Sequence, residues 1–358
     1  MRRSAACVAI VVATTLLAVI GCASRGQTGY GPLTLYAPAT GNPMPGALYA
    51  RAIQLRGNGS YHNRMYATFE CYVNGRPAFP IYESKDSGKK WKKISDVTDQ
   101  VNGWGMRYQP FLYELPAAVG NLSAGTVLCA GNSIPPDLSE TKIDIYKSTD
   151  ALRTWTFVSS VASGGRADPS GDFDPVWEPF LMVANDRLIC YYSDETDPSY
   201  SQKLVHKTSA DGVSWSAAVN DVALSARRLR PGMATVAQMA NGNYIMTYEV
   251  VDTGKSYFKT SANPESWTPA DEGTAFGNGG APYVAVMADG KIVATSYGSD
   301  TIYENTGNGT GSWTRAAGTI GRGYSRALVP LASGRLFVIS GGDIGVYKNL
   351  VTYGDMAP

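Results

Sequence analysis

Residues 84–91 read Ser84-Lys85-Asp86-Ser87-Gly88-Lys89-Lys90-Trp91, a pattern of the form Ser-x-Asp-x-Gly-x-x-Trp. Each residue type suits a tight turn between two strands. Asp caps such a turn with its side chain, Gly adopts positive φ, and Trp packs the turn onto its sheet. Weaker copies of this turn, the Asp box, occur at 148–155, 209–215, 261–267 and 306–313. Because each copy follows a strand-like run, the five together predict a repeated sheet unit.

A second repeat runs in phase with the Asp boxes and consists of an apolar strand, a turn and another apolar strand. Its six copies begin at Arg51, Gln109, Glu178, Arg230, Ala281 and Arg326. Each copy supplies the two inner strands of a sheet, and the Asp box then joins the third strand to the fourth. We therefore predict an all-β fold, a six-bladed β-propeller of four-stranded antiparallel blades over residues 30–355. The strand at 33–36 is expected to complete the last blade, and five blades are the structural alternative.

The N-terminus reads as a targeting segment rather than part of the fold. A basic start is followed by an almost wholly apolar run at 5–20 and then by Val19-Ile20-Gly21-Cys22, which resembles a bacterial lipobox. We expect residues 1–21 to be a lipoprotein-type signal peptide, Cys22 to be lipidated, and residues 22–29 to be a tether. The protein would then be exported as a cell-surface or outer-membrane lipoprotein. An ordinary secretory signal or an uncleaved anchor remains as an alternative.

Composition excludes several kinds of chemistry. The 358 residues carry a formal net charge of +1, which gives no reason to expect nucleic acid as a partner. The three remaining cysteines, at 71, 129 and 190, sit in separate apolar runs and are expected to be buried free thiols. The only histidines are His62 and His206. These residues offer no zinc-type cluster, so no metal or cofactor is expected. We expect a monomer.

Propeller topology restricts where chemistry can occur. The start of each inner strand and the end of the second strand lie on one face near the axis, whereas the Asp boxes lie on the opposite face. Arginines, carboxylates and aromatic side chains gather at these strand ends, which suits a saccharide. The candidate substrate-binding residues are Arg51, Arg107, Tyr108, Trp177, Asp194, Glu195, Arg230, Tyr283, Tyr324 and Arg326.

Two carboxylates on this face belong to adjacent blades, Glu178 and Glu249. Glycoside hydrolysis needs two carboxyl groups, close together for retention of configuration and further apart for inversion. Neighbouring blades can supply either spacing. Two alternatives remain open: one or both glutamates form structural ion pairs with Arg230 or Arg107, or the Asp194-Glu195 pair takes the catalytic place.

Four segments carry a family resemblance: 177–179 (Trp-Glu-Pro), 192–195 (Tyr-Ser-Asp-Glu), 230–233 (Arg-Pro-Gly-Met) and 247–249 (Thr-Tyr-Glu). They resemble the exo-1,5-α-L-arabinanases, a glycoside hydrolase family within the sialidase-like Asp-box (BNR-repeat) propellers. The resemblance implies a six-bladed propeller that releases arabinobiose from α-1,5-linked arabinan with retention. It also implies catalytic glutamates at positions 178 and 249.

Further expectations concern roles and specificity. The flanking Trp177 and Pro179 favour Glu178 as the acid/base, because apolar surroundings raise a carboxyl pKa, which leaves Glu249 as the nucleophile. The long turn at 57–63 is expected to reshape one edge of the funnel. A sialidase-like enzyme using Tyr324 with Arg51, Arg230 and Arg326 is the second hypothesis. A non-catalytic glycan-binding propeller is the third.

Overall fold

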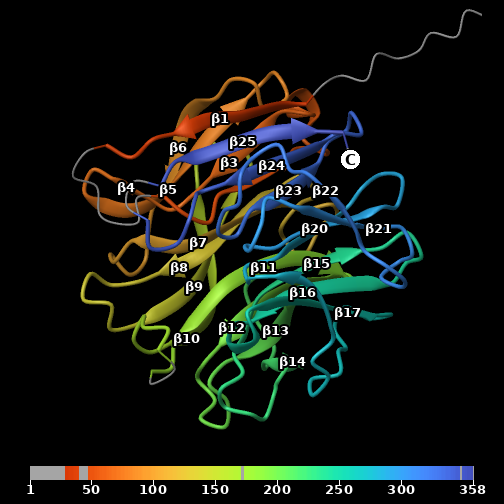
Figure 1. Cartoon of the computed structure of the whole chain (residues 1–358). Helices are drawn as coiled ribbons and strands as arrows, with labels where there is room; N and C mark the ends of the chain where they lie inside the picture. Colours follow the sequence, from red (N-terminus) through yellow and green to blue (C-terminus); the bar gives the residue numbers. More distant parts are fainter. Residues whose placement is uncertain (1–28, 40–46, 171–172, 347–348, 358) are drawn as a thin grey trace, which may run out of the picture.

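Six antiparallel sheets surround a central axis in the computed structural model (Figure 1), which describes residues 29–39, 47–170, 173–346 and 349–357. The predicted six-bladed all-β propeller is confirmed. The signal segment, Cys22 and most of the tether lie outside the described residues. Among the residues described, no helix is long and apolar enough to cross a membrane.

Each blade contributes its strands in chain order from the axis outward. Blade 1 contains β2 (Arg51–Gln54), β3 (Met65–Thr68), β5 (Arg76–Ser84) and β6 (Lys92–Val97), with a short extra strand β4 (Cys71–Val73) paired to β5. Blade 2 contains β7 (Met106–Glu114), β8 (Val127–Ser133), β9 (Thr141–Ser148) and β10 (Thr156–Gly164). Blade 3 contains β11 (Val176–Ala184), β12 (Arg187–Asp194), β13 (Lys203–Ser209) and β14 (Val219–Val222).

The remaining blades follow the same plan. Blade 4 contains β15 (Pro231–Gln238), β16 (Tyr244–Val250), β17 (Lys255–Ser261) and β18 (Thr274–Asn278). Blade 5 contains β19 (Tyr283–Val286), β20 (Ile292–Thr295), β21 (Ile302–Asn305) and β22 (Thr314–Ala316). Blade 6 contains β23 (Ala327–Pro330), β24 (Leu336–Ser340), β25 (Val351–Met356) and β1 (Tyr30–Tyr36). The 3₁₀ turns are η1 (Gly59–Tyr61) and η2 (Val251–Thr253).

The N-terminal strand closes the ring, as the sequence predicts. β1 pairs antiparallel with β25, with Leu33 opposite Tyr353. The two strands lie side by side at the top of Figure 1, although more than 300 positions separate them in sequence. Blade 6 therefore holds both ends of the propeller together, and β25 has no exposed edge.

The Asp boxes form the turns between third and fourth strands in five blades. In the first, the Asp86 carboxylate accepts the backbone N–H of Lys90 (2.8 Å), and the Ser84 hydroxyl accepts that of Gly88 (2.9 Å), which has a φ of +86°. The Trp91 indole donates to the Gly88 carbonyl at 3.0 Å. These contacts satisfy the backbone of the turn and confirm its architectural role.

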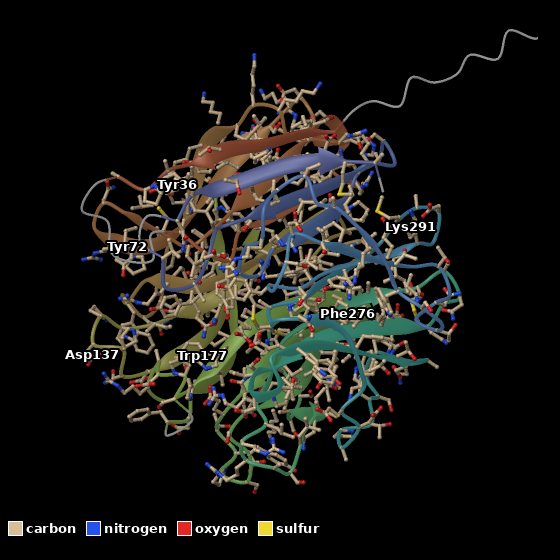
Figure 2. All side chains as sticks on the ribbon, in the orientation of Figure 1. Tyr36, Tyr72, Asp137, Trp177, Phe276 and Lys291 are labelled. Carbon is tan, nitrogen blue, oxygen red and sulfur yellow. The ribbon has the colours of Figure 1, made fainter. Side chains whose placement is uncertain are left out.

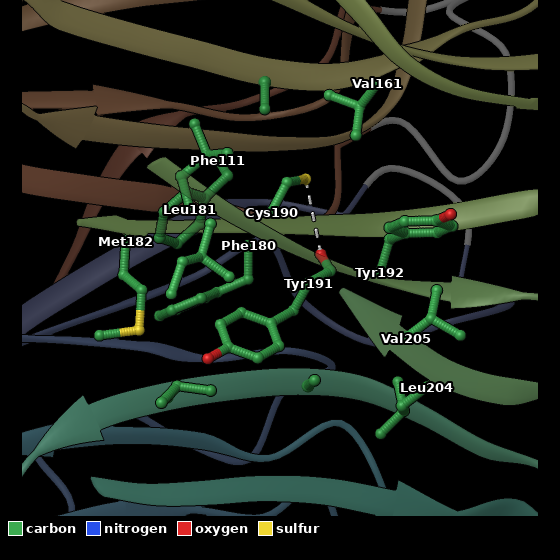
Figure 3. Close-up of a cluster of buried hydrophobic side chains, with 14 of the residues drawn as sticks. Phe111, Val161, Phe180, Leu181, Met182, Cys190, Tyr191, Tyr192, Leu204 and Val205 are labelled. Carbon is green, nitrogen blue, oxygen red and sulfur yellow. Dashed lines mark hydrogen bonds between the residues drawn. The ribbon is translucent and has the colours of Figure 1, made fainter. Parts of the chain in front are cut away.

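The core lies between neighbouring blades. Figure 3 shows the largest cluster, in which Phe111 of blade 2 packs on Phe180 of blade 3 with ring centroids 4.5 Å apart. Cys190 lies in this cluster, and it is a buried free thiol, as are Cys71 and Cys129. The predicted state of the three cysteines is therefore confirmed.

The turn at 57–63 lies on the Asp-box face, not at the funnel. It connects an inner strand to its second strand, so it emerges where the inner strands end. The backbone N–H of Gly57 and the Asn58 amide both donate to Glu114, the last residue of β7, at 3.0 and 2.7 Å. The expectation that this turn reshapes the funnel edge is wrong, because strand direction places it at the other end of the axis.

Trp155 tests how much one Asp box contributes to stability. Its side chain is buried in the cluster between blades 1 and 2, and its indole donates to Ser95 at 3.3 Å. We expect Trp155→Ala to lower the free energy of unfolding by about 3–5 kcal/mol, measured by guanidinium denaturation. Val213→Ala, in an exposed position of the third box, is the control and should change it by less than about 0.5 kcal/mol. Equal losses would contradict the assigned role.

Candidate active site

A ring of left-handed backbone surrounds the top of the axis. At the start of every inner strand, one non-glycine residue has a φ between +47° and +62°: Tyr49, Gln109, Glu178, Met233, Ala281 and Ser325. The strand register shifts at this point in β7, β11 and β15. Positive φ is unfavourable for residues with a Cβ and collects at functional sites. At the ring, the backbone conformation and the strand pairing of each repeat differ from those of a regular β-sheet.

Several ring residues donate their backbone N–H to a side chain of the preceding blade. The N–H of Gln109 donates to Glu70 (2.9 Å), and that of Glu178 donates to the Gln109 side chain (3.0 Å). The N–H of Met233 donates to Glu178 (2.8 Å), and that of Ala281 donates to Glu249 (2.6 Å). The ring therefore fixes three glutamates around the axis.

Glu178 is held by three donors. Its Oε2 accepts the Ser193 hydroxyl at 2.7 Å and the N–H of Met233 at 2.8 Å, while its Oε1 accepts the Tyr49 hydroxyl at 3.3 Å. Burial raises the pKa of Glu178, and the three donors oppose that rise because they favour the ionised form. Trp177 does not provide the apolar setting expected from the sequence, because its indole Nε1 turns to Glu195 at 2.8 Å.

Glu249 has a poorer set of partners. The N–H of Ala281 is the one hydrogen bond recorded to its carboxylate among the described residues. Burial, followed by the negative charge of Glu178, raises the pKa of Glu249 to about 7. The pKa values of both carboxyl groups are raised, and the three donors on Glu178 favour its ionised form more than the single donor on Glu249 does.

Glycine at position 232 lets the two carboxylates face each other. A Cβ on Gly232 would lie 3.5 Å from Glu178 Oε2 and 3.5 Å from Glu249 Oε1, so these two oxygens are within about 7 Å of one another. The same Cβ would lie only 2.5 Å from the Gln202 amide nitrogen. A larger residue would therefore displace Gln202 and push into the space between the carboxylates.

A pocket of about 370 Å³ opens above the ring. Aromatic and polar side chains line it, with loop residues from two blades at its edge: Leu48, Tyr49, Glu70, Tyr108, Gln109, Ala167, Pro169, Trp177, Glu178, Gln202, Tyr324, Ile344 and Gly345. Figure 2 places Trp177 on the left of the molecule, together with Tyr72, and places Lys291, in the turn between β19 and β20, on the right. The pocket thus occupies the face opposite the inner hairpin turns.

Glu70 is a third carboxyl group in this pocket. Its side chain is buried, and burial raises its pKa to about 8 against the opposing effects of the Gln109 N–H and Arg51. It is therefore protonated at neutral pH and has an O–H to donate. Tyr324 faces all three glutamates, whose charges join burial in raising its pKa, and its hydroxyl lies 3.1 Å from that of Tyr49.

The structure brings together some of the predicted substrate-binding residues in the pocket wall. Tyr108, Trp177 and Tyr324 line it, and the rings of Tyr108 and Trp177 lie 6.4 Å apart. Arg230 stands nearby but is engaged by Glu195 through two hydrogen bonds of 2.8 and 3.2 Å. The predicted residue Glu195 is therefore a partner of Arg230, and among the described residues Arg230 forms no ion pair with Glu178 or Glu249, the alternative left open by the sequence.

The other predicted residues do not line the pocket. Arg51 is buried against the ring, where it donates to the Ser325 hydroxyl and carbonyl at 2.7 and 2.9 Å. Tyr283 lies next to it, with the guanidinium 5.4 Å from the ring centroid. Arg107 donates to the Tyr72 hydroxyl at 2.7 Å. The Asp194 carboxylate caps its own turn by accepting from Thr196.

Arg326 is placed outside the site. It is 1% exposed and donates to the carbonyls of four residues in or beside blade 5: Ser296, Ser299, Asp300 and Thr301. These contacts give Arg326 a structural place between blades, in contrast to the substrate contact expected from the sequence. The positive φ of Ser325 shifts the alternation of the strand, so that the side chain of the next residue points between blades rather than toward the axis.

Sequence reasoning missed Tyr49 and Gln202. Three ring residues are followed by proline: Gln109-Pro110, Glu178-Pro179 and Ala281-Pro282. Tyr49, Met233 and Ser325 lack that proline, and the proline of the fourth copy, Pro231, follows Arg230 instead, so this signal does not reach Tyr49. Gln202 lies outside the repeat, and no sequence signal marks it. Among the described residues, no cluster of His, Cys, Asp and Glu is placed to hold a metal.

Comparison with solved structures extends over almost the entire propeller. The Penicillium chrysogenum α-L-arabinanase complexed with arabinobiose is 38% identical, with a TM-score of 0.87, and the match covers 92% of this chain and 98% of that one. The GH93 α-L-arabinofuranosidase of Fusarium graminearum with arabinobiose is 37% identical, with a TM-score of 0.85 and the same coverage. No family model matches the chain, and no curated protein does.

More distant matches share the fold alone. A Hadza microbial sialidase is 13% identical, with a TM-score of 0.56 over 86% of this chain and 65% of that one. The carboxylate-lined pocket and the close matches define a glycoside hydrolase on a sialidase-like propeller. Within that class, the chain belongs to glycoside hydrolase family 93, with the arabinanase and arabinofuranosidase described above.

Substitution of Arg326 tests whether this arginine stabilises the fold or binds substrate. Arg326→Met would remove the buried donor shared by four backbone carbonyls, of which that of Ser296 is in a buried residue, so we expect the free energy of unfolding to fall by about 3 kcal/mol. The KM of the folded protein for linear arabino-oligosaccharides should not change. Arg322→Met, whose side chain is 59% exposed, is the control and should leave stability nearly unchanged. A raised KM with unchanged stability for Arg326→Met would reverse this assignment.

Proposed function

We propose that this protein is a retaining, exo-acting hydrolase of α-1,5-linked arabinan that releases arabinobiose. The observation that carries the proposal is the pair Glu178 and Glu249, which face each other across Gly232 beside a saccharide-sized pocket. The substrate class rests on the two relatives bound to arabinobiose, each matched over 98% of its length. A glutamate-to-alanine mutant of the Fusarium graminearum enzyme, in complex with an iminosugar inhibitor, is also 36% identical to this chain.

The spacing of the carboxylates accommodates retention. Retaining glycosidases hold their carboxyl groups about 5–5.5 Å apart, and inverting ones about 6.5–9.5 Å apart to admit a water. One oxygen of Glu178 and one of Glu249 lie within about 7 Å of each other, so the retaining mechanism rests on the family relationship and is tested by the product's anomeric configuration. A retaining reaction starts from one ionised and one protonated carboxyl group, and the unequal hydrogen bonding of Glu178 and Glu249 suits that division.

Hydrogen bonding supports a division of roles opposite to the sequence-based expectation. Glu178, with three donors, is the better-stabilised carboxylate and serves as the nucleophile. Glu249, with its pKa raised to about 7, serves as the acid and then the base. The sequence favoured the reverse because Trp177 is adjacent to Glu178 in the chain, whereas its indole is directed to Glu195.

The reaction proceeds in two steps. Glu178 attacks the anomeric carbon of the second residue from the non-reducing end while Glu249 donates its proton to the departing glycosidic oxygen, which leaves an arabinobiosyl ester on Glu178. Glu249, now ionised, takes a proton from water, and the resulting attack on the anomeric carbon regenerates the Glu178 carboxylate. The protonated Glu70 and the Tyr324 hydroxyl supply donors for sugar oxygens, and the Tyr108 and Trp177 rings supply apolar contact area.

The arginine contacts disfavour the sialidase alternative. That hypothesis needs Arg51, Arg230 and Arg326 to hold a substrate carboxylate together. Arg51 is engaged by Ser325, Arg230 by Glu195, and Arg326 by backbone carbonyls. No free arginine cluster of this kind faces the pocket in the described part of the chain.

Substitution of each glutamate tests the pair. We expect Glu178→Gln and Glu249→Gln each to lower kcat on linear arabinan by at least about 100-fold, measured as arabinobiose release by chromatography. Glu140→Gln, at an exposed position, is the control and should keep full activity. The anomeric configuration of the first product, read by NMR, should match that of the substrate. Inverted product, or an active Glu249→Gln enzyme, would refute the mechanism.

The pH dependence follows from Glu249 as the acid. Its pKa of about 7 means that the required proton is present below pH 7 and is lost above it. We expect kcat/KM to fall about tenfold per pH unit on the alkaline side, with a midpoint near 7. The residual activity of Glu249→Gln should lack this alkaline fall. An unchanged alkaline limb in that variant would assign the proton to another group.

A further inference from the structure

A lysine-rich surface surrounds the first Asp box, on the face opposite the pocket. Five lysines lie within nine positions, and all five are exposed: Lys85, Lys89, Lys90, Lys92 and Lys93. We call this group the lysine patch. Together with Arg153, four of the five border a groove of about 770 Å³. The whole chain has a formal net charge of only +1, so this concentration of positive charge is local.

The acidic residues near the patch do not neutralise it. Glu83 is buried and shared between Arg64 at 3.0 Å and Arg153 at 3.5 Å, so it has little charge left for Lys85 at 3.8 Å. The Asp86 carboxylate is occupied by its own turn. Asp96 pairs with Lys93 at 2.7 Å. Within the described residues, Lys89, Lys90 and Lys92 have no acidic partner.

The described chain begins beside this patch. Tyr30, the first residue of β1, donates its hydroxyl to the Ser87 carbonyl at 2.9 Å, inside the first Asp box. Tyr353, on the strand paired with β1, donates to the Lys89 carbonyl at 3.1 Å. In Figure 1 the chain reaches β1 at the end where the β25 arrow finishes. The N-terminal segment therefore meets the propeller at the lysine patch.

The sequence before Tyr30 adds a second reason to expect a lipid surface. Eight Cα–Cα steps separate Cys22 from Tyr30, which span at most about 28 Å when fully extended. A lipid on Cys22 would hold this edge of blade 1 within that distance of a bilayer. Lysines near an anionic headgroup surface are attracted to it, and the attraction adds to that of a lipid chain.

We propose that the lysine patch docks on anionic phospholipid headgroups and that the substrate pocket faces away from the membrane. The patch and the N-terminal entry point share one edge of the propeller, whereas the pocket opens on the opposite face. The lipid and the patch together fix an orientation that either one alone leaves free. The docked enzyme presents Glu178 and Glu249 to polysaccharide approaching from the aqueous side.

The test uses the chain from residue 23, which lacks Cys22 but retains every strand of the six blades. We expect it to cosediment with vesicles of phosphatidylglycerol and phosphatidylcholine, and not with phosphatidylcholine alone. Binding should weaken as NaCl rises from about 0.05 M to about 0.5 M. Replacing the five patch lysines by glutamine should weaken binding at least tenfold and leave arabinobiose release unchanged, so the docking result does not depend on the proposed function.

A matched control removes the same charge elsewhere. Five exposed basic residues from other blades, replaced by glutamine, give the same net charge: Arg187, Arg227, Arg228, Lys255 and Arg315. This variant should bind the anionic vesicles like the parent chain. An equal loss of vesicle binding in both variants would show that binding depends on net charge alone, and it would overturn the proposal. Failure of the parent chain to bind vesicles would also overturn it, as would binding to soluble polygalacturonate in place of vesicles.

Discussion

The left-handed backbone residue at the top of each inner strand is the constraint on which the site depends. A regular strand directs its N–H groups into the sheet ladder. The break at the ring releases some of these N–H groups, which then donate to side chains of the preceding blade. Four such contacts, to Glu70, Gln109, Glu178 and Glu249, tie blades 1 to 5 together at the axis. The same device that joins the blades therefore positions the carboxylates.

The blades differ in the donors that they provide to the glutamates near the ring, and these differences give the glutamates different chemical properties. Glu178 is itself a ring residue and gains a serine and a tyrosine hydroxyl in addition to a backbone N–H. Glu249 and Glu70 are at the ends of second strands, and within the described part of the chain each accepts a hydrogen bond only from a backbone N–H of the next blade. Burial raises the pKa of all three carboxyl groups, but the number of donors that oppose this rise differs from one glutamate to the next. Small residues at the ring, above all Gly232, keep the space between the carboxylates open.

The two faces of the propeller carry separate tasks. One face holds the Asp boxes, the inner hairpin turns and the edge at which β1 enters blade 6. The other face holds the pocket. Strand direction enforces this separation, because an inner hairpin turn and an Asp box always fall at the end where inner strands finish. The turn at 57–63 obeys the same rule and braces the lower end of blade 2 through Glu114. Additions to these turns leave the pocket unchanged.

The sequence by itself determined the propeller, the number of blades, the closing strand at 33–36 and the face that carries Glu178 and Glu249. Repeat spacing and the alternation of strand residues encode these features locally. Only the tertiary structure decided which charged residues reach the pocket: Arg326 turns away, Arg230 is engaged by Glu195, and Tyr49 and Gln202 enter from outside the recognised patterns. The left-handed ring residues change which face of the strand the following side chains point to, and the two-residue periodicity of the sequence does not indicate this change. Hydrogen-bond counts and burial, which separate nucleophile from acid, exist only once distant strands meet.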